Sequence, residues 1–328
     1  MRAEALLDAI GDVRNVYIQQ AQLRKKKHRQ LPWIAAAAAC LALVLTAGLL
    51  LRPSSNKYPP IPWPQAGGQT SLSAEFSLDP ALTLPDTAEP IAVYQPVIPN
   101  LDALCAELAA FHGLDNQWKE NDLHRYIATD TCLLEVEKDT GYWTYQDRTV
   151  IKFSNEPSIL TDDEAIQIAK ATAEHYGVDL AFLSNVQVGH GTISSADTPI
   201  GQEAIVGHDV YFYPSIDGYD VWGICRFMVS VNGTGQVSTV MKLYPEFALH
   251  AMEQAVSPAD AFRAIQAGAG HFMDTTDATS VVFHSYDIIY YADFDPATQQ
   301  QYCQPLYVFY GDDCRVLYPV LGEQRFRG

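Results

Sequence analysis

Residues 219–244 read YDVWGICRFMVSVNGTGQVSTVMKLY and carry the clearest fold signal in the chain. From Ile224 to Val231, apolar side chains at the odd-numbered positions alternate with a more mixed set, which is the period of a strand with one buried face. Asn232-Gly233 is a favoured two-residue hairpin turn, so a second strand is expected at 235–244. The stretch therefore predicts an antiparallel sheet.

Strand and helix patterns surround this hairpin. Further strands are predicted at 131–137, 142–153, 203–215, 280–295, 304–310 and 314–320. Three helices are indicated by their caps, namely Asn100 to Gly113, Thr161 to Gly177 with Thr161 and Glu164 as a capping box, and Ser257 to Gly268 with Pro258 in the first helical position. Together they predict an α+β domain over residues 100–328, in which antiparallel sheets are each packed by helices.

Two of the helix openings share a pattern. In both, a hydroxyl N-cap (Thr161 or Ser257) is followed three residues later by an acid, then by alanine and an apolar residue. The acids of the first turn, Asp162 included, complement the helix dipole and are interpreted as structural. The repeat predicts two related halves, 100–195 and 196–328.

A basic cluster followed by an apolar segment occupies residues 24–51. No charge occurs from Leu31 to Leu51, and at about 1.5 Å per residue those 21 positions form a helix of roughly 30 Å, the thickness of the hydrocarbon core of a bilayer. The predicted anchor includes Leu31, Trp33, Leu41, Leu45 and Leu51, and the topology-setting residues before it are Arg24, Lys25, Lys26, Lys27 and Arg29. The sequence thus predicts an N-terminal transmembrane helix and a single-pass protein of the cell membrane, with a cytoplasmic N-terminus and an extracytoplasmic C-terminal domain. A cleaved secretory signal and a lipoprotein lipidated at Cys40 are the alternatives.

Two further segments complete the predicted organisation. Residues 1–30 form a cytoplasmic amphipathic leader, whose candidate partner-binding face is Leu6, Ile10, Val13 and Tyr17. Residues 52–99 hold ten of the 19 prolines and are predicted to be an extracytoplasmic spacer.

Charge separates the leader from the rest of the chain. Residues 1–30 contain seven Lys or Arg and three Asp or Glu, a net charge of +4, and since the whole chain carries −18, the remainder carries −22. An acidic surface repels nucleic acid and anionic lipid, so nucleic acid is excluded as a partner.

No catalytic, metal-binding or cofactor-binding motif is recognisable. The chain lacks H-E-x-x-H, G-x-S-x-G, C-x-x-C and a Gly-rich phosphate loop, so no cofactor is predicted. The nine histidines are scattered singly, and His190, His208 and His284 fall within strand patterns, where a hydrogen-bonded sheet residue is the expected role.

Five cysteines follow the apolar segment, namely Cys105, Cys132, Cys225, Cys303 and Cys314. In an oxidising compartment one of them is left over, and free buried thiols explain the odd count equally well. A Cys303–Cys314 bond is not expected, because the hairpin at Gly311-Asp312 puts Cys314 opposite Phe309, about 20 Å from Cys303 along an extended strand.

The C-terminal part of the chain resembles a known class of regulators. Residues 157–321 resemble PepSY-type domains and the YycH/YycI-like extracytoplasmic regulators of Gram-positive bacteria. The shared features are a capped S/T-x-x-[DE]-A helix, strands reading YFYPSIDGYDVWG and VNGTGQV, and a closing Pro-Leu-Tyr-Val-Phe strand. This resemblance implies a membrane-anchored ectodomain that modulates a signalling partner, and it brings no catalytic residues.

The leader has a resemblance of its own. LLDAIGDVRNVYIQQAQ at 6–22 resembles the N-terminal segment of single-pass anti-sigma-factor-like proteins of clostridial type, although the His and paired Cys of the zinc-containing class are absent. The resulting hypothesis is a sensor or regulatory protein, not an enzyme, that binds a peptide, an envelope component or a partner ectodomain and modulates a sigma factor or sensor kinase. The alternative is a membrane-anchored extracytoplasmic enzyme or protease inhibitor.

Overall fold

A computed structural model describes residues 58–59, 61, 74–152, 156–193, 203–273, 279–294, 298 and 300–322. The predicted leader (1–30), its candidate partner-binding face, the basic cluster and the apolar segment 31–51 lie outside these residues. Among the helices that are described, none is long and apolar enough to cross a bilayer.

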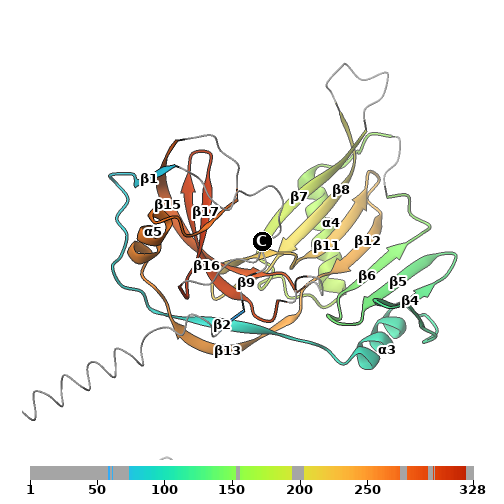
Figure 1. Cartoon of the computed structure of the whole chain (residues 1–328). Helices are drawn as coiled ribbons and strands as arrows, with labels where there is room; N and C mark the ends of the chain where they lie inside the picture. Colours follow the sequence, from blue (N-terminus) through green and yellow to red (C-terminus); the bar gives the residue numbers. More distant parts are fainter. Residues whose placement is uncertain are drawn as a thin grey trace, which may run out of the picture. The chain divides into compact units, whose positions relative to one another are not determined.

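The larger sheet has eight antiparallel strands (Figure 1). In spatial order they are β3 (Lys119–Glu120), β4 (His124–Ala128), β5 (Cys132–Glu137), β6 (Trp143–Asp147), β12 (Val237–Lys242), β11 (Phe227–Asn232), β8 (Ala204–Tyr213) and β7 (Asn185–Ile193). Both faces of β11 are buried, so its even-numbered residues do not face solvent as predicted. On that face the Asn232 side chain donates to the carbonyl of Ile151, and the Ser230 hydroxyl donates to Asp209.

The second sheet has seven strands and is not purely antiparallel. Its order is β14 (His271–Phe272), β17 (Arg315–Pro319), β16 (Gln304–Gly311), β15 (Ser280–Ala292), β10 (Tyr219–Gly223) and β9 (Ser215–Ile216), with β1 (Glu75–Leu78) also paired with β15. Both β1 and β10 run parallel to β15, one at each of its ends. A separate ribbon joins β2 (Pro90–Val97) to β13 (Glu246–Gln254).

Three helices accompany the sheets, and their N-caps are as the sequence predicts. Asn100 caps α3 (Leu101–Phe111), Thr161 caps α4 (Asp162–His175), and Ser257 caps α5 (Pro258–Gln266). In α4 the Thr161 amide donates to the Glu164 carboxylate at 2.9 Å, and the Glu164 amide donates back to Thr161 Oγ1 at 3.3 Å. The capping box is therefore confirmed.

The predicted α+β class, with each sheet packed by helices, is wrong. Strands make up 46% of the described residues and helices 15%. Helices of 11, 14 and 9 residues are too short to cover two sheets, so much of the sheet surface is buried against strands and loops instead. Strands β7 and β8, which lie on opposite sides of the predicted division at residue 195, pair in one sheet.

One predicted strand is divided between the two sheets. Residues 219–231 contain β10 in the seven-stranded sheet and β11 in the eight-stranded sheet, with the chain crossing between them after Gly223. Gly223 has φ of 116°, and a Cβ there would lie 2.2 Å from the carbonyl oxygen of Ala292. Only glycine fits such a backbone conformation and approach.

The hairpin between β11 and β12 also differs from the prediction. The Asn232 amide donates to the carbonyl of Gln236 at 2.9 Å, which closes a loop of three residues and not the predicted two. Gly235, with φ of 88°, takes the left-handed position typical of such loops, and the register shifts at Ser230/Val231.

Part of the predicted spacer is built into the domain. Strands β1 and β2 both lie within residues 52–99. Tyr58 and Ile61 are buried, and the carbonyl of Pro59 accepts a hydrogen bond from the Gln304 side chain at 3.2 Å. Proline-rich sequence therefore packs on the seven-stranded sheet, where Ile61 contacts an apolar cluster with Ile289.

Candidate functional site

Helix α4 lies on the eight-stranded sheet through a stripe of alanines. Ala165, Ala169 and Ala173 are fully buried, and the helix packs on β8 and β11. Because alanine has only a methyl side chain, the helix backbone lies close to the sheet, and little of the sheet surface beside the helix is filled.

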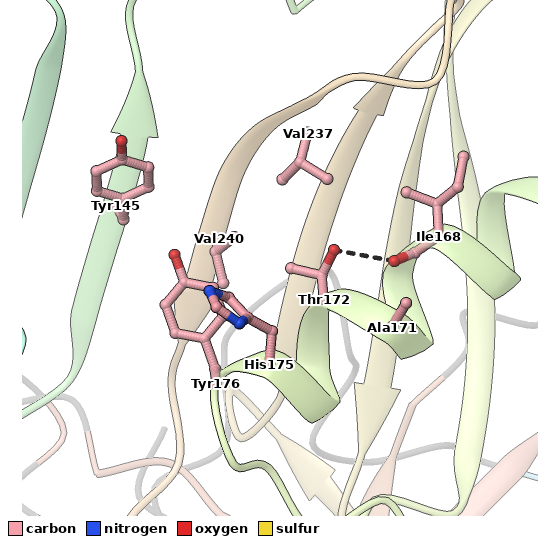
Figure 2. A pocket seen from close by; sticks show the side chains of 8 residues that line it. All are labelled: Tyr145, Ile168, Ala171, Thr172, His175, Tyr176, Val237 and Val240. Atoms are coloured by element: carbon pink, nitrogen blue, oxygen red, sulfur yellow. Dashed lines mark hydrogen bonds between the residues drawn. The ribbon is translucent and has the colours of Figure 1, made fainter. Parts of the chain in front are cut away.

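An open groove of about 490 Å³ runs beside α4, between the helix and strands β6 and β12 (Figure 2). Its lining residues are Ile168, Ala171, Thr172, His175 and Tyr176 from α4 and its C-cap, Tyr145 from β6, and Val237 and Val240 from β12. The Thr172 hydroxyl donates to the carbonyl of Ile168 at 2.9 Å, so it is satisfied within the helix. The volume is within the usual range for ligand sites.

Aromatic rings from α3, α4 and β6 pack together at the C-terminal end of α4. The His112 ring stacks on Tyr145 with centroids 3.9 Å apart, and Phe111 of α3 contacts both His175 and Tyr176 at 5.0 and 4.8 Å. Trp143 stacks on Tyr176 at 5.3 Å. These ring contacts fix the side chains that bound the groove before any ligand arrives.

Burial favours the neutral forms of His112, Tyr145 and Tyr176 at this end of the groove. Burial, with a smaller contribution from nearby His175, lowers the pKa of His112 to about 4. Burial also raises the pKa of Tyr176 and of Tyr145 above the ordinary value for tyrosine. The groove lining contains no carboxylate and consists mainly of apolar and aromatic side chains, with His175 as its imidazole.

A second constellation lies at the other end of α4. His190 of β7 and His208 of β8 are directly paired in the antiparallel register, and Asp162 is the first residue of the helix above them. Asp162 Oδ1 lies 2.8 Å from His190 Nε2 and 3.4 Å from His208 Nε2. Burial lowers the pKa of His208, His190 lowers it further, and Asp162 opposes both.

This constellation could not be predicted from the separate sequence patterns, in which His190 and His208 are sheet histidines and Asp162 is a helix-dipole residue. A signal was nevertheless present, because Val-Gly-His occurs at 188–190 and again at 206–208. In the antiparallel pairing of β7 with β8, the two histidines of these tripeptides face each other, because His190 is paired with His208. His284, the third singled-out histidine, contacts Asp79 at 3.3 Å and Asp312 at 2.9 Å, one at each ring nitrogen.

Burial makes Cys225 and Cys303 poor candidates for a reactive thiol. Cys105, Cys132, Cys225, Cys303 and Cys314 are all free and buried. Burial raises the pKa of Cys225 to about 12 and that of Cys303 well above its ordinary value. Thiols of this kind stay protonated and are poor nucleophiles. Phe309 pairs with Val316, so the predicted position of Cys314 opposite Phe309 is wrong, and Cys303 and Cys314 lie beyond opposite ends of β16.

Comparisons of the chain with protein-family models, curated proteins and solved structures found no match. The resemblance to PepSY-type and YycH/YycI-like regulators, and that of the leader to anti-sigma-factor-like proteins, therefore stay predictions.

Proposed function

We propose that this chain is a binding protein whose β-rich domain holds a cationic, amphipathic peptide segment of a partner protein in the groove beside α4. The groove itself is the observation that carries the proposal, since it is open, apolar and aromatic, and already shaped by ring packing. An extended or helical peptide places an apolar side chain in such a groove while its polar side stays in water.

Charge favours a cationic partner. Residues after the leader carry −22, and α4, which forms one wall of the groove, has four carboxylates and a single lysine. Complementary charge raises the association rate and disfavours acidic competitors. The apolar lining anchors the peptide, and the acidic surroundings favour a peptide with a positive charge.

Membrane attachment and signalling belong to the same proposal. The charge-free segment 31–51 supports a location at the cell membrane with the domain on the extracytoplasmic side. The resemblance to extracytoplasmic regulators supports a signalling partner, such as a sensor kinase, or a sigma factor bound through the leader.

The binding function is favoured over the enzyme alternative by the composition of the groove. A hydrolytic cleft needs converging acids, bases or a nucleophile, whereas the groove lining contains one imidazole, two phenols and one hydroxyl among apolar side chains. Tyr145 and Tyr176 are rigid amphipathic surfaces of the kind enriched at peptide-binding sites.

The test uses the full-length protein in detergent and two series of synthetic twelve-residue peptides with the same aromatic and leucine positions. One series carries lysine at its polar positions and the other glutamate. Ala171→Trp fills the groove from an exposed helix position, and Gln167→Trp is the matched control, since Gln167 is exposed on the same helix but does not line the groove. A photo-crosslinking residue at position 171 then identifies the contacting segment in native membranes.

We expect the lysine series to bind the unsubstituted protein and the Gln167→Trp variant alike, and to bind Ala171→Trp at least tenfold more weakly. Equal binding of both peptide series, or unchanged binding by Ala171→Trp, contradicts the proposal. A crosslink from position 171 only to the protein's own chain also contradicts it, because the groove is then occupied internally.

A further inference from the structure

Three side chains at the N-terminal end of α4 present converging metal-binding atoms. Asp162 contributes a carboxylate oxygen, and His190 and His208 each contribute Nε2, with the three atoms within 4.8 Å of one another. We propose that Asp162, His190 and His208 form a site for a divalent transition-metal ion, for which Zn²⁺ is the appropriate probe.

The spacing already matches such a site. Two ligands bound to zinc at roughly 2.0–2.1 Å in tetrahedral geometry lie about 3.3 Å apart. The Asp162 carboxylate oxygen lies 2.8 Å from the imidazole nitrogen of His190 and 3.4 Å from that of His208. Small side-chain rotations therefore suffice to admit the ion.

The backbone holds the two imidazoles in this arrangement. His190 and His208 are register partners on adjacent antiparallel strands, and their rings meet edge to face with centroids 5.5 Å apart. The capping box fixes the first turn of α4, and with it Asp162. Three ligands on two strands and a capped helix are more precisely placed than ligands on loops.

The burial of His208 is a separate feature that favours a metal site. Its side chain is 1% exposed, its Nδ1 atom has no hydrogen-bond partner among the described residues, and the 3.4 Å contact of Nε2 with Asp162 is long. A buried polar ring with so little compensation is costly. Coordination of a metal ion at Nε2 supplies a strong bond at the atom that points into the cluster.

The donor set and surroundings select the class of ion. Two imidazoles and one carboxylate suit Zn²⁺ and its neighbours in the transition series, whereas Mg²⁺ and Ca²⁺ require mostly oxygen ligands. The helix dipole gives the N-terminal end of α4 a positive potential, which disfavours a bound cation. The first turn of the helix carries three carboxylates, Asp162, Asp163 and Glu164, and their negative charge offsets this potential. The Asp162 and His190 side chains are 51% and 33% exposed, so water can complete the coordination.

The competing explanation is a hydrogen bond within the cluster, with His190 Nε2 donating to the Asp162 carboxylate. This arrangement requires no metal and makes the constellation a surface hydrogen bond. The absence of a hydrogen-bond partner on His208 Nδ1 bears on affinity too, because ligand histidines lacking an outer hydrogen bond bind metal about 10- to 100-fold more weakly.

The experiment uses the full-length protein in detergent, without a polyhistidine tag and stripped of metal by a chelator. Zn²⁺, Mg²⁺ and Ca²⁺ are titrated separately by calorimetry at pH 7.5, and Co²⁺ is added to record the visible spectrum of the bound ion. The variants are His190→Ala and Asp162→Asn, at partly exposed positions. His284→Ala is the matched control, since His284 also contacts two carboxylates, but through opposite ring nitrogens that cannot chelate one ion.

We expect one Zn²⁺ per chain, a rise in Tm of roughly 5–10 °C at a hundredfold excess over Kd, and at least a tenfold loss of affinity in both cluster variants but not in His284→Ala. Zinc binding that is equal in the unsubstituted protein and His190→Ala, no zinc binding, or equally strong binding of Ca²⁺ overturns the proposal. If His190→Ala does not fold, a Co²⁺ spectrum without tetrahedral bands in the unsubstituted protein overturns it independently.

Discussion

Acidification is expected to destabilise the domain through His112, whose ring stacks on Tyr145 at the end of the groove. Its pKa is about 4 in the folded protein, against 6.5 for an unperturbed histidine. Because the folded value is depressed, the unfolded chain binds the proton more readily, so the contribution of His112 to stability is complete above pH 6.5 and is lost as the pH falls from 6.5 towards 4.

The magnitude follows from the two pKa values. A difference of one pKa unit corresponds to about 1.36 kcal/mol, and integrating between the two values gives a loss of about 2 kcal/mol at pH 5 relative to pH 7.5. His208 and His271, whose pKa values are also lowered by burial, act in the same direction. The contribution of His112 is therefore isolated by comparison with a variant and not read from the pH curve of one protein.

The assay is urea unfolding of the full-length protein in detergent, followed by circular dichroism at pH 7.5, 6 and 5. His112→Phe keeps a ring to stack on Tyr145 and removes only the 3.5 Å contact of His112 Nε2 with the Tyr176 hydroxyl. We expect this variant to lose about 2 kcal/mol less stability than the unsubstituted protein between pH 7.5 and 5. His284→Phe is the control, because the His284 side chain is 43% exposed and the substitution removes a histidine from the surface. Equal losses in the unsubstituted protein and His112→Phe would refute the reasoning.

Four further substitutions test the packing. Thr161→Ala removes the capping box and should lower the unfolding free energy by about 1 kcal/mol, measured as a shift in the urea midpoint. Ala169→Leu overpacks the interface between α4 and the sheet and should cost about 1–3 kcal/mol, whereas an unchanged Tm would show that the helix is not closely packed. Gly223→Ala places a Cβ against the Ala292 carbonyl, and its cost of at least about 3 kcal/mol should abolish the soluble yield of folded protein. Leu134→Ala opens a cavity in the fully buried core and should cost about 2–5 kcal/mol in the same urea assay.

Features that depend on neighbouring residues could be predicted from the sequence. At the N-caps Asn100, Thr161 and Ser257, the side chain accepts a hydrogen bond from the amide three residues later, so a four-residue pattern contains the whole interaction. Alternation likewise located β8, β15 and β16, because burial of one face acts within each strand, whereas β2 and β13 were not predicted.

Pairing between distant residues could not be predicted in this way. β10 and β11 read as one strand because both alternate, and only the approach of Ala292, some seventy residues later in the chain, explains why Gly223 separates them. In the same way β1 lies in proline-rich sequence and becomes a strand through parallel pairing with β15. The Asp162 cluster is non-local too, although the repeated Val-Gly-His provides a local sign of it.

The groove exists because of the side chains by which α4 packs. The helix α5 covers its sheet with Phe262 and Ile265, large side chains that spread over the neighbouring surface. The sheet-facing stripe of α4 is alanine throughout, which brings the backbone close to β8 and β11 but adds almost no volume towards β12 and β6. The Val240 and Tyr145 side chains on those strands consequently line an open groove. The same close approach places the first residue of the helix within reach of the two histidines on β7 and β8, so both candidate sites follow from one alanine stripe.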